Sequence, residues 1–192
     1  MDKIIAGLDL SLTGTGYTVM RSNGEILDSG VIKSKPQGKL PLDEIKRING
    51  IVVEIRDKLT KSLPESRLND VKLDLVVIEG LAFMAKGTSL VQLGGLNYLL
   101  RMDFLHAQVP FVIVAPTSLK KFITGSGKGD KELLMMTIFK KYGFEAKTNN
   151  DADAYALAAI GSSLLGYPLI KEIKPQTEVL KLLEKQVCKA TK

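Results

Sequence analysis

The fold is decided by residues 4–17, which read IIAGLDLSLTGTGY. The apolar, β-branched first part predicts a buried strand over 3–10, and the glycines that follow indicate a tight turn into a second strand over 16–21. Asn23-Gly24 is a hairpin signal that leads into a third strand over 25–34. Three strands joined by short turns predict an antiparallel meander.

Beyond the meander the chain alternates helices and strands. From Pro41 to Leu59 apolar residues recur at spacings of three and four, which predicts an amphipathic helix that ends near Ser62. The order predicts an α/β fold with a five-stranded mixed sheet, in which three antiparallel strands are followed by parallel additions, flanked by helices. The other predicted elements are strands over 73–79 and 111–114 and helices over 89–107, 117–123, 131–142, 150–164 and 176–185.

The composition is that of a folded chain. Its 192 residues are 45% hydrophobic and 25% charged, which is enough to bury a core. We expect one domain over 1–166 and a basic C-terminal tail with a short helix over 167–192. One cysteine, Cys188, and one histidine, His106, exclude a disulfide framework and a cysteine or histidine-cluster metal site. Without a long apolar run or a signal-peptide pattern, we expect a cytoplasmic protein with no membrane partner.

Basic residues outnumber acidic ones by 27 to 21, which gives a net charge of +6. Residues 115–141 carry six lysines against two acidic residues, and the last 22 residues carry six against three. The net charge alone is compatible with nucleic acid, with other anionic surfaces or with no particular partner. Its concentration in the C-terminal half is the more informative feature.

Three carboxylates occupy positions where a core would be apolar. Asp9 ends the first strand, Glu79 ends the fourth, and Asp153 lies near the start of an alanine-rich helix. A single carboxylate at a strand end is usually a cap or a surface residue, but two at the carboxyl ends of strands in one sheet favour a shared site. Buried carboxylates repel one another, and a divalent cation relieves that repulsion. Oxygen ligands without cysteine or histidine indicate Mg²⁺ or Mn²⁺.

Four segments of the chain resemble the RuvC-type Holliday-junction resolvases of the ribonuclease H-like superfamily. The most specific are the run FMAK and the Gly-Ser-Gly loop with a lysine behind it. The resemblance implies a ribonuclease H-like fold and a metal-dependent nuclease of four-way or branched DNA. The four segments are 4–17, VVIEGLAFMAK at 76–86, the basic stretch 116–131 and DAYALA at 153–158.

The resemblance also implies roles for individual residues. Asp9 is the first metal ligand and Glu79 the second, and Phe83 lies in a loop that enters the junction. Lys131 matches a DNA-contacting lysine and is assigned to the catalytic set as well. The residues expected to contact DNA are Phe83, Lys86, Lys120, Lys121, Ser126, Lys128 and Lys131.

One position departs from the family pattern. The family usually has a carboxylate or a histidine three residues before its last aspartate, and this chain has Asn150 there. Asn150 could bind metal through its amide oxygen, or it could be only the helix N-cap. A third alternative is that the helix starts later and Asp151 turns into the site, although on a regular helix Asp151 points about 200° away from Asp153. Candidate metal ligands are therefore Asp9, Glu79 and Asp153, with Asn150 or Asp151.

The implied activity is the paired hydrolysis of two opposed strands, with two Mg²⁺ ions in each active site and Mn²⁺ as a substitute. Two cuts need two sites and hence a homodimer with twofold symmetry. An apolar stripe on the helix over 89–107 offers a contact, although most such stripes are core. The absence of a targeting segment suits a bacterial cytoplasm or a phage-encoded enzyme. The stripe consists of Leu90, Leu93, Leu96, Leu99 and Leu100.

Three other functions remain open. The first is a flap or fork nuclease on the same fold. The second is a junction-binding module without catalytic activity, for which Asn150 is the only indication. The third is an ATPase of the sugar-kinase and actin type, which also has an aspartate and a glycine-rich hairpin after its first strand but normally needs about twice this length.

Overall fold

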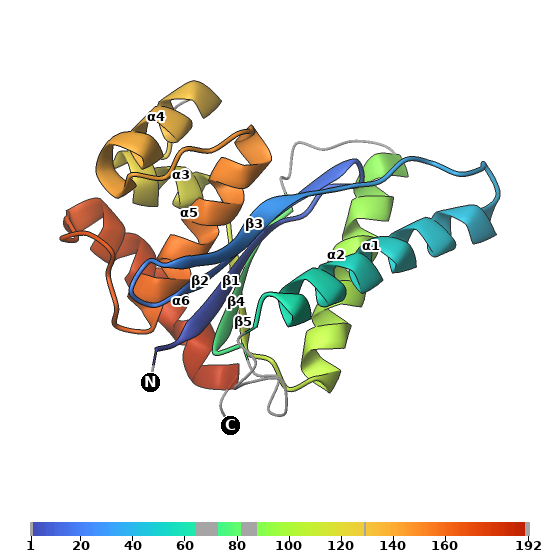
Figure 1. Cartoon of the computed structure of the whole chain (residues 1–192), viewed down its shortest axis with the longest axis horizontal. Helices are drawn as coiled ribbons and strands as arrows, with labels where there is room; N and C mark the ends of the chain where they lie inside the picture. The colour runs from blue at the N-terminus through green and yellow to red at the C-terminus, as the bar shows by residue number, and fades with distance from the viewer. Residues whose placement is uncertain (1, 64–72, 82–87, 129, 191–192) are drawn as a thin grey trace.

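The structure is a computed structural model that describes residues 2–63, 73–81, 88–128 and 130–190. A five-stranded mixed sheet forms its centre, in the order β3-β2-β1-β4-β5 (Figure 1). The first three strands are antiparallel, and β4 and β5 extend the sheet as parallel neighbours of β1. The predicted mixed sheet is confirmed. The strands are β1 Ile4–Asp9, β2 Gly14–Arg21, β3 Ile26–Lys33, β4 Leu75–Glu79 and β5 Phe111–Val114.

Helices cover both faces of the sheet (Figure 1). Helices α1 and α2 pack on one face, and α5 with α3, α4 and α6 packs on the other. Two predicted ranges, 111–114 and 131–142, agree at both ends with the structure. The helices are α1 Pro41–Lys61, α2 Thr88–His106, α3 Pro116–Thr124, α4 Lys131–Tyr142, α5 Asn149–Leu164 and α6 Lys174–Ala190.

The pairing of β1 with β4 determines where the acidic residues lie. Both strands are continuous apolar runs because helices cover them on both faces. They run parallel, with Leu8 opposite Ile78. The residue after each, Asp9 and Glu79, is therefore at the same edge of the sheet.

Helix α5 lies directly on β1, with almost no side chain between the two backbones. A Cβ atom added to Gly7 would lie 2.1 Å from the carbonyl oxygen of Ala154 and 2.5 Å from the nitrogen of Ala158. Further along, a Cβ atom on Gly161 would lie 2.5 Å from a methyl group of Ile5. The alanine-rich sequence of α5 and these two glycines permit this close approach.

Helix α6 is longer than the predicted 176–185 segment. Its Val179, Leu180 and Leu183 are buried in the same core cluster as the residues of α5. The Gln186 side chain donates to the carbonyl of Ile113 and accepts from its amide, at 3.1 and 3.0 Å. The segment that we predicted as a basic tail thus completes the core and covers the β5 edge of the sheet.

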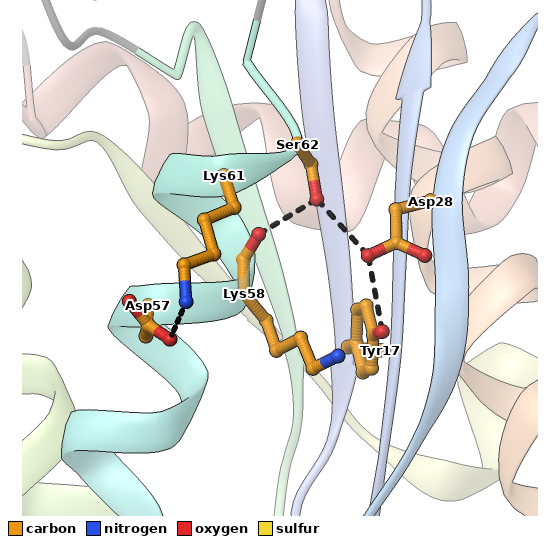
Figure 2. Close-up of polar contacts among 6 residues, drawn as sticks. All are labelled: Tyr17, Asp28, Asp57, Lys58, Lys61 and Ser62. Atoms are coloured by element: carbon orange, nitrogen blue, oxygen red, sulfur yellow. Dashed lines mark hydrogen bonds and ion pairs between the residues drawn. The ribbon is translucent and has the colours of Figure 1, made fainter.

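The C-terminal end of α1 is fixed to the sheet by a polar cluster (Figure 2). The carboxylate of Asp28 on β3 accepts hydrogen bonds from the Tyr17 hydroxyl at 3.1 Å and from the Ser62 hydroxyl at 3.3 Å. The Lys58 ammonium lies 5.7 Å from the centre of the Tyr17 ring. These contacts hold α1 against β2 and β3.

We predict that Gly7→Ala lowers the free energy of unfolding by about 2 kcal/mol or more, because the new methyl group forces α5 away from β1. Gly50→Ala is the matched control, since Gly50 lies in α1 with no atom within 4 Å of an added Cβ. That change should raise stability by up to about 1 kcal/mol through helix propensity. Urea unfolding of both variants measures the difference, and a Gly7→Ala variant as stable as the wild type would contradict the predicted close contact.

Candidate active site

The three predicted carboxylates come from β1, β4 and α5. Asp9 is only 8% exposed, and Glu79 and Asp153 are partly buried. The side chains of Asp9 and Glu79 are hydrogen bonded to each other, which requires that they share a proton. Asp153 acts electrostatically on Glu79, and Asp9 acts on Asp153. The fold thus brings together three acidic residues that are up to 144 positions apart in the sequence.

Burial raises the pKa of all three groups, and the negative charge of Asp9 adds to this effect for Glu79 and Asp153. Burial raises the pKa of Asp9 above its usual value. Burial, followed by the negative charge of Asp9, raises the pKa of Glu79 to about 9. The same two causes raise the pKa of Asp153 to about 6. The site therefore retains protons that exposed carboxylates would lose, as expected where a cation is to bind.

Lys131 is the basic residue that acts on all three carboxylates, and it lowers the pKa of each. It is the first residue of α4, and this helix begins there because the Asp130 carboxylate accepts from the amide of Leu133 at 2.8 Å. Lys120 on α3 lowers the pKa of Asp153 as well. The structure therefore brings two of the predicted lysines to the acidic group.

The donor set fits a hard divalent cation, because three partly buried oxygen ligands repel one another and hold excess protons. In the present arrangement, no group of three or more acidic, histidine or cysteine side chains among the described residues is placed to hold a metal ion. Asp9 and Glu79 instead bond to each other. Binding of a cation would replace their shared proton.

Asn150 has a different partner from any that the sequence suggested. Helix α5 begins at Asn149, and its N-cap is Thr148, whose hydroxyl accepts from the amide of Asp151 at 3.1 Å. The alternatives with Asn150 as N-cap and with a later helix start are therefore wrong. The Asn150 amide nitrogen donates a hydrogen bond to the carbonyl of Gly14.

Asp151 does not join the other carboxylates. It is 6% exposed and lines a cavity of about 360 Å³ between β3 and the start of α5. Ser29 and Val31 form one side of this cavity and Phe144 another. The condition under which Asp151 was expected to turn into the site, a later helix start, is not met, because α5 runs from Asn149 and Asp151 points to another side of the helix than Asp153.

The other predicted DNA contacts have varied environments. Lys121 forms an ion pair with Glu178 of α6 at 2.6 Å, so it holds α3 to α6. The Ser126 hydroxyl accepts from the amide of Lys128 at 3.2 Å and shapes the loop between α3 and α4, where the Lys128 side chain is exposed. Two more predicted contacts, Phe83 and Lys86, lie outside the residues that the structure describes.

The leucine stripe of α2 is largely core, and the opposite face of the helix is the exposed one. Leu96 and Leu100 are fully buried against α1 and the sheet. Leu96 and Leu100 are therefore not available for a contact with a second copy, whereas Leu99, from the same stripe, is 41% exposed. The exposed apolar residues of α2 are Val91, Tyr98, Leu99, Met102 and Leu105.

Sequence reasoning missed Arg47. On α1, its guanidinium donates to the carbonyl of Leu12 and, at 3.0 Å, to the hydroxyl of Ser34. Leu12 belongs to the turn that follows Asp9. Nothing in the local pattern distinguishes Arg47 from the other surface cations of an amphipathic helix.

Together, the mixed sheet, the carboxylates at adjacent strand ends and the nearby lysines define a nuclease-type site of the ribonuclease H-like class. The sequence model of the family described as crossover junction endodeoxyribonuclease RuvC matches residues 5–162, and the chain belongs to this family. The chain is 27% identical over 164 residues to the crossover junction endodeoxyribonuclease RuvC of Prochlorococcus marinus. The aligned region covers 82% of this chain and 96% of the relative. The protein of the same name from Neorickettsia sennetsu is 25% identical over 185 residues, with 89% and 98% covered.

Solved structures show the same fold. The structure of Thermus thermophilus RuvC has a TM-score of 0.66 and 21% identity, and covers 85% of this chain and 97% of that one. The same protein in complex with a Holliday junction substrate has a TM-score of 0.64 and 21% identity, with 81% and 90% covered. Among the described residues, none of the helices has the length and apolar character needed to cross a bilayer.

We predict that, in EDTA, stability falls as the pH rises from about 5 to 9. Glu79 and Asp153 have ordinary pKa values of 4.5 and 3.8 and folded values of about 9 and 6. Between these values the folded protein holds protons that the unfolded chain has lost. The free energy of unfolding therefore falls as the pH rises through each folded pKa. With partial exposure taken into account, we expect a loss of about 2 kcal/mol, or a fall in Tm of about 4–8 °C.

Thermal unfolding at several pH values tests this expectation. Glu79→Gln should remove most of the pH-dependent loss, while Glu145→Gln, at an exposed position, should leave it unchanged. Equal pH dependence in the wild type and Glu79→Gln would show that ionisation of Glu79 does not destabilise the folded protein.

Proposed function

We propose that this chain is a divalent-metal-dependent endonuclease that resolves four-way DNA junctions by paired cuts in two opposed strands. The observation that carries the proposal is the meeting of Asp9, Glu79 and Asp153 under the influence of Lys131. Membership of the RuvC family supports the reaction, and a relative of the same fold is described with a Holliday junction substrate. Such an enzyme would work in the cytoplasm of a bacterial cell, whether the cell or a phage encodes it.

The three carboxylates would hold the metal. Asp9, Glu79 and Asp153 would together hold two Mg²⁺ ions, with Mn²⁺ as a substitute. When bound, two such ions activate a water molecule, stabilise the charge of the phosphoryl oxygens and stabilise the leaving 3′-oxygen. Lys131 would neutralise the phosphate that approaches the acidic group, which otherwise would repel it. The P–O3′ bond breaks as the water oxygen bonds to phosphorus.

Basic residues around the site would hold the DNA backbone. Lys120 and Lys131 already act on the carboxylates, and Lys128 and Ser126 lie in the exposed loop between α3 and α4. Phe83 and Lys86 remain candidates through the family resemblance. Lys121 is a weaker candidate, because its ammonium is held by Glu178.

Two cuts at one junction require two active sites, so we propose a homodimer with twofold symmetry. The exposed apolar face of α2 is its best candidate interface. Val91 is 73% exposed, Tyr98 65% and Leu105 62%, which is unusual for a single helix face of a monomer. Burial of this face in a second copy would remove the apolar area from water.

The alternative of a silent junction-binding module loses its only support. That alternative depended on Asn150 as a missing ligand, but Asn150 is bonded to Gly14 and the three carboxylates are all present. Family membership likewise disfavours the sugar-kinase and actin interpretation.

A synthetic four-way junction with labelled strands tests the activity. We expect paired, symmetric nicks with Mg²⁺ or Mn²⁺, no cleavage in EDTA, and a loss of at least about 10³-fold in rate for Asp9→Asn, since the change would remove a charged ligand of the ions. Asp28→Asn changes a partly buried carboxylate on β3, which β2 and β1 separate from β4, and this control should still cut. Equal cleavage of a fork or flap would favour the branched-DNA alternative, and tight binding without cleavage would refute the enzyme.

The dimer is tested by sedimentation of Leu105→Glu against Phe139→Glu. Both residues are exposed, at 62% and 56%, but Phe139 lies on α4. We expect Leu105→Glu to be monomeric and to make single, unpaired nicks, while Phe139→Glu stays dimeric. A wild type that is monomeric on the junction, or a Leu105→Glu variant that stays dimeric, would contradict the α2 interface.

A further inference from the structure

The turn over residues 10–14, directly after Asp9, is held by a dense set of its own hydrogen bonds. The Ser11 hydroxyl accepts from the amides of Thr13 and Gly14 at 3.2 and 3.4 Å. The Ser11 amide donates to the Thr15 hydroxyl at 3.1 Å, and that hydroxyl donates to the Ser11 carbonyl at 2.8 Å. None of these bonds uses the carbonyls of Leu12 and Gly14, which accept hydrogen bonds from side chains outside the turn.

Helix α1 supplies the donor on one side. The Arg47 guanidinium donates to the Leu12 carbonyl and to the hydroxyl of Ser34, which follows β3. The amide of Ser34 in turn donates to the carbonyl of Thr13 at 3.3 Å. Arg47 thereby ties the turn to α1 and to the end of β3 at once.

Helix α5 supplies the donor on the opposite face of the sheet. The Asn150 side-chain nitrogen donates to the Gly14 carbonyl. The backbone of Asn150 also lies close to β2, since a Cβ atom added to Gly16 would lie 2.1 Å from the Asn150 carbonyl oxygen. Gly16 is the partner of Asp9 in the β1–β2 ladder, so this contact lies beside the carboxylate.

The chemistry of the contact requires an amide at position 150. A side chain that faces a carbonyl oxygen must donate a hydrogen bond, and an ionised carboxylate can only accept. An aspartate here would place two acceptors against each other in a partly buried position, which costs free energy. Asparagine instead adds a donor and no charge beside three carboxylates.

We propose that Arg47 and Asn150 are positioning residues that hold the turn after Asp9 from the two faces of the sheet and so fix the orientation of the Asp9 carboxylate. The effect on catalysis rests on the proposed function, but the effect on the turn does not. Neither residue needs to touch DNA or the reacting atoms to act in this way.

The test compares Arg47→Ala, Asn150→Ala and Asn150→Asp with two matched controls. Arg56→Ala removes another arginine of α1, one whose exposed ion pair with Asp103 spans 3.3 Å. Asn149→Ala changes the exposed neighbour of Asn150 in α5. Amide hydrogen exchange is measured at Ser11, Thr13, Gly14 and Ser34, with β4 as an internal reference, and junction cleavage is measured as separate kcat and KM values.

We expect all three test variants to exchange these four amides at least about 10-fold faster while β4 keeps its protection. Their kcat should fall by about 10- to 100-fold with KM changed less than about 3-fold, because a small displacement of one reacting group impairs the chemical step. The controls should match the wild type in both measurements.

Unchanged exchange at the turn would overturn the proposal, and so would an Asn150→Asp variant that cuts faster than the wild type, since the position would then serve as a ligand. If the wild type cuts no junction, the proposed function fails, and the exchange measurement alone still decides whether the two residues hold the turn.

Discussion

The close contact between α5 and β1 is the constraint on which the rest of the molecule depends. Because the carbonyl of Ala154 and the backbone of Gly7 leave no room for a Cβ atom, the helix has one available position on the sheet. That position brings Asp153 to the carboxyl ends of β1 and β4 and brings Asn150 to the Gly14 carbonyl. A larger residue at Gly7 would displace both side chains together. The small residues of α5 thus serve the site as much as the core.

The site is a place where function opposes stability. Asp9 and Glu79 lie at the ends of buried strands, and burial raises the pKa of both carboxyl groups, so the folded state opposes their ionisation. Lys131 moderates this effect from the first turn of α4, and Lys120 does so for Asp153. The surrounding structure compensates with packed helices, such as α6, whose Gln186 pairs with the backbone of β5 at one edge of the sheet. A well-packed core therefore supports an electrostatically unfavourable edge.

Much of the fold was predictable because its signals are local. The Asn23-Gly24 turn, the spacing of apolar residues in α1 and the apolar runs of β4 and β5 are local patterns that tertiary contacts did not override. The meeting of Asp9 and Glu79 was predictable because parallel strand ends meet at one edge, whereas the place of Asp153 depends on how α5 packs across those ends. The exposed face of α2 was not predictable, because a leucine stripe indicates an apolar face without showing whether the chain itself covers it. The length of α6 and the roles of Arg47 and Asn150 depend on contacts between residues up to 136 positions apart, which no spacing in the sequence encodes.

Asn150 shows how a departure from a family pattern can be compatible with the same chemistry. A fourth carboxylate at this place would add repulsion to a group in which Glu79 already has a pKa of about 9. An amide avoids that charge and also gives the Gly14 carbonyl a donor, which the turn's own hydroxyl groups do not supply. The gain matters beside Asp9, because Gly16, over which the Asn150 backbone lies, is the ladder partner of Asp9. A rigid support for one carboxylate can thus take the place of an additional negative charge.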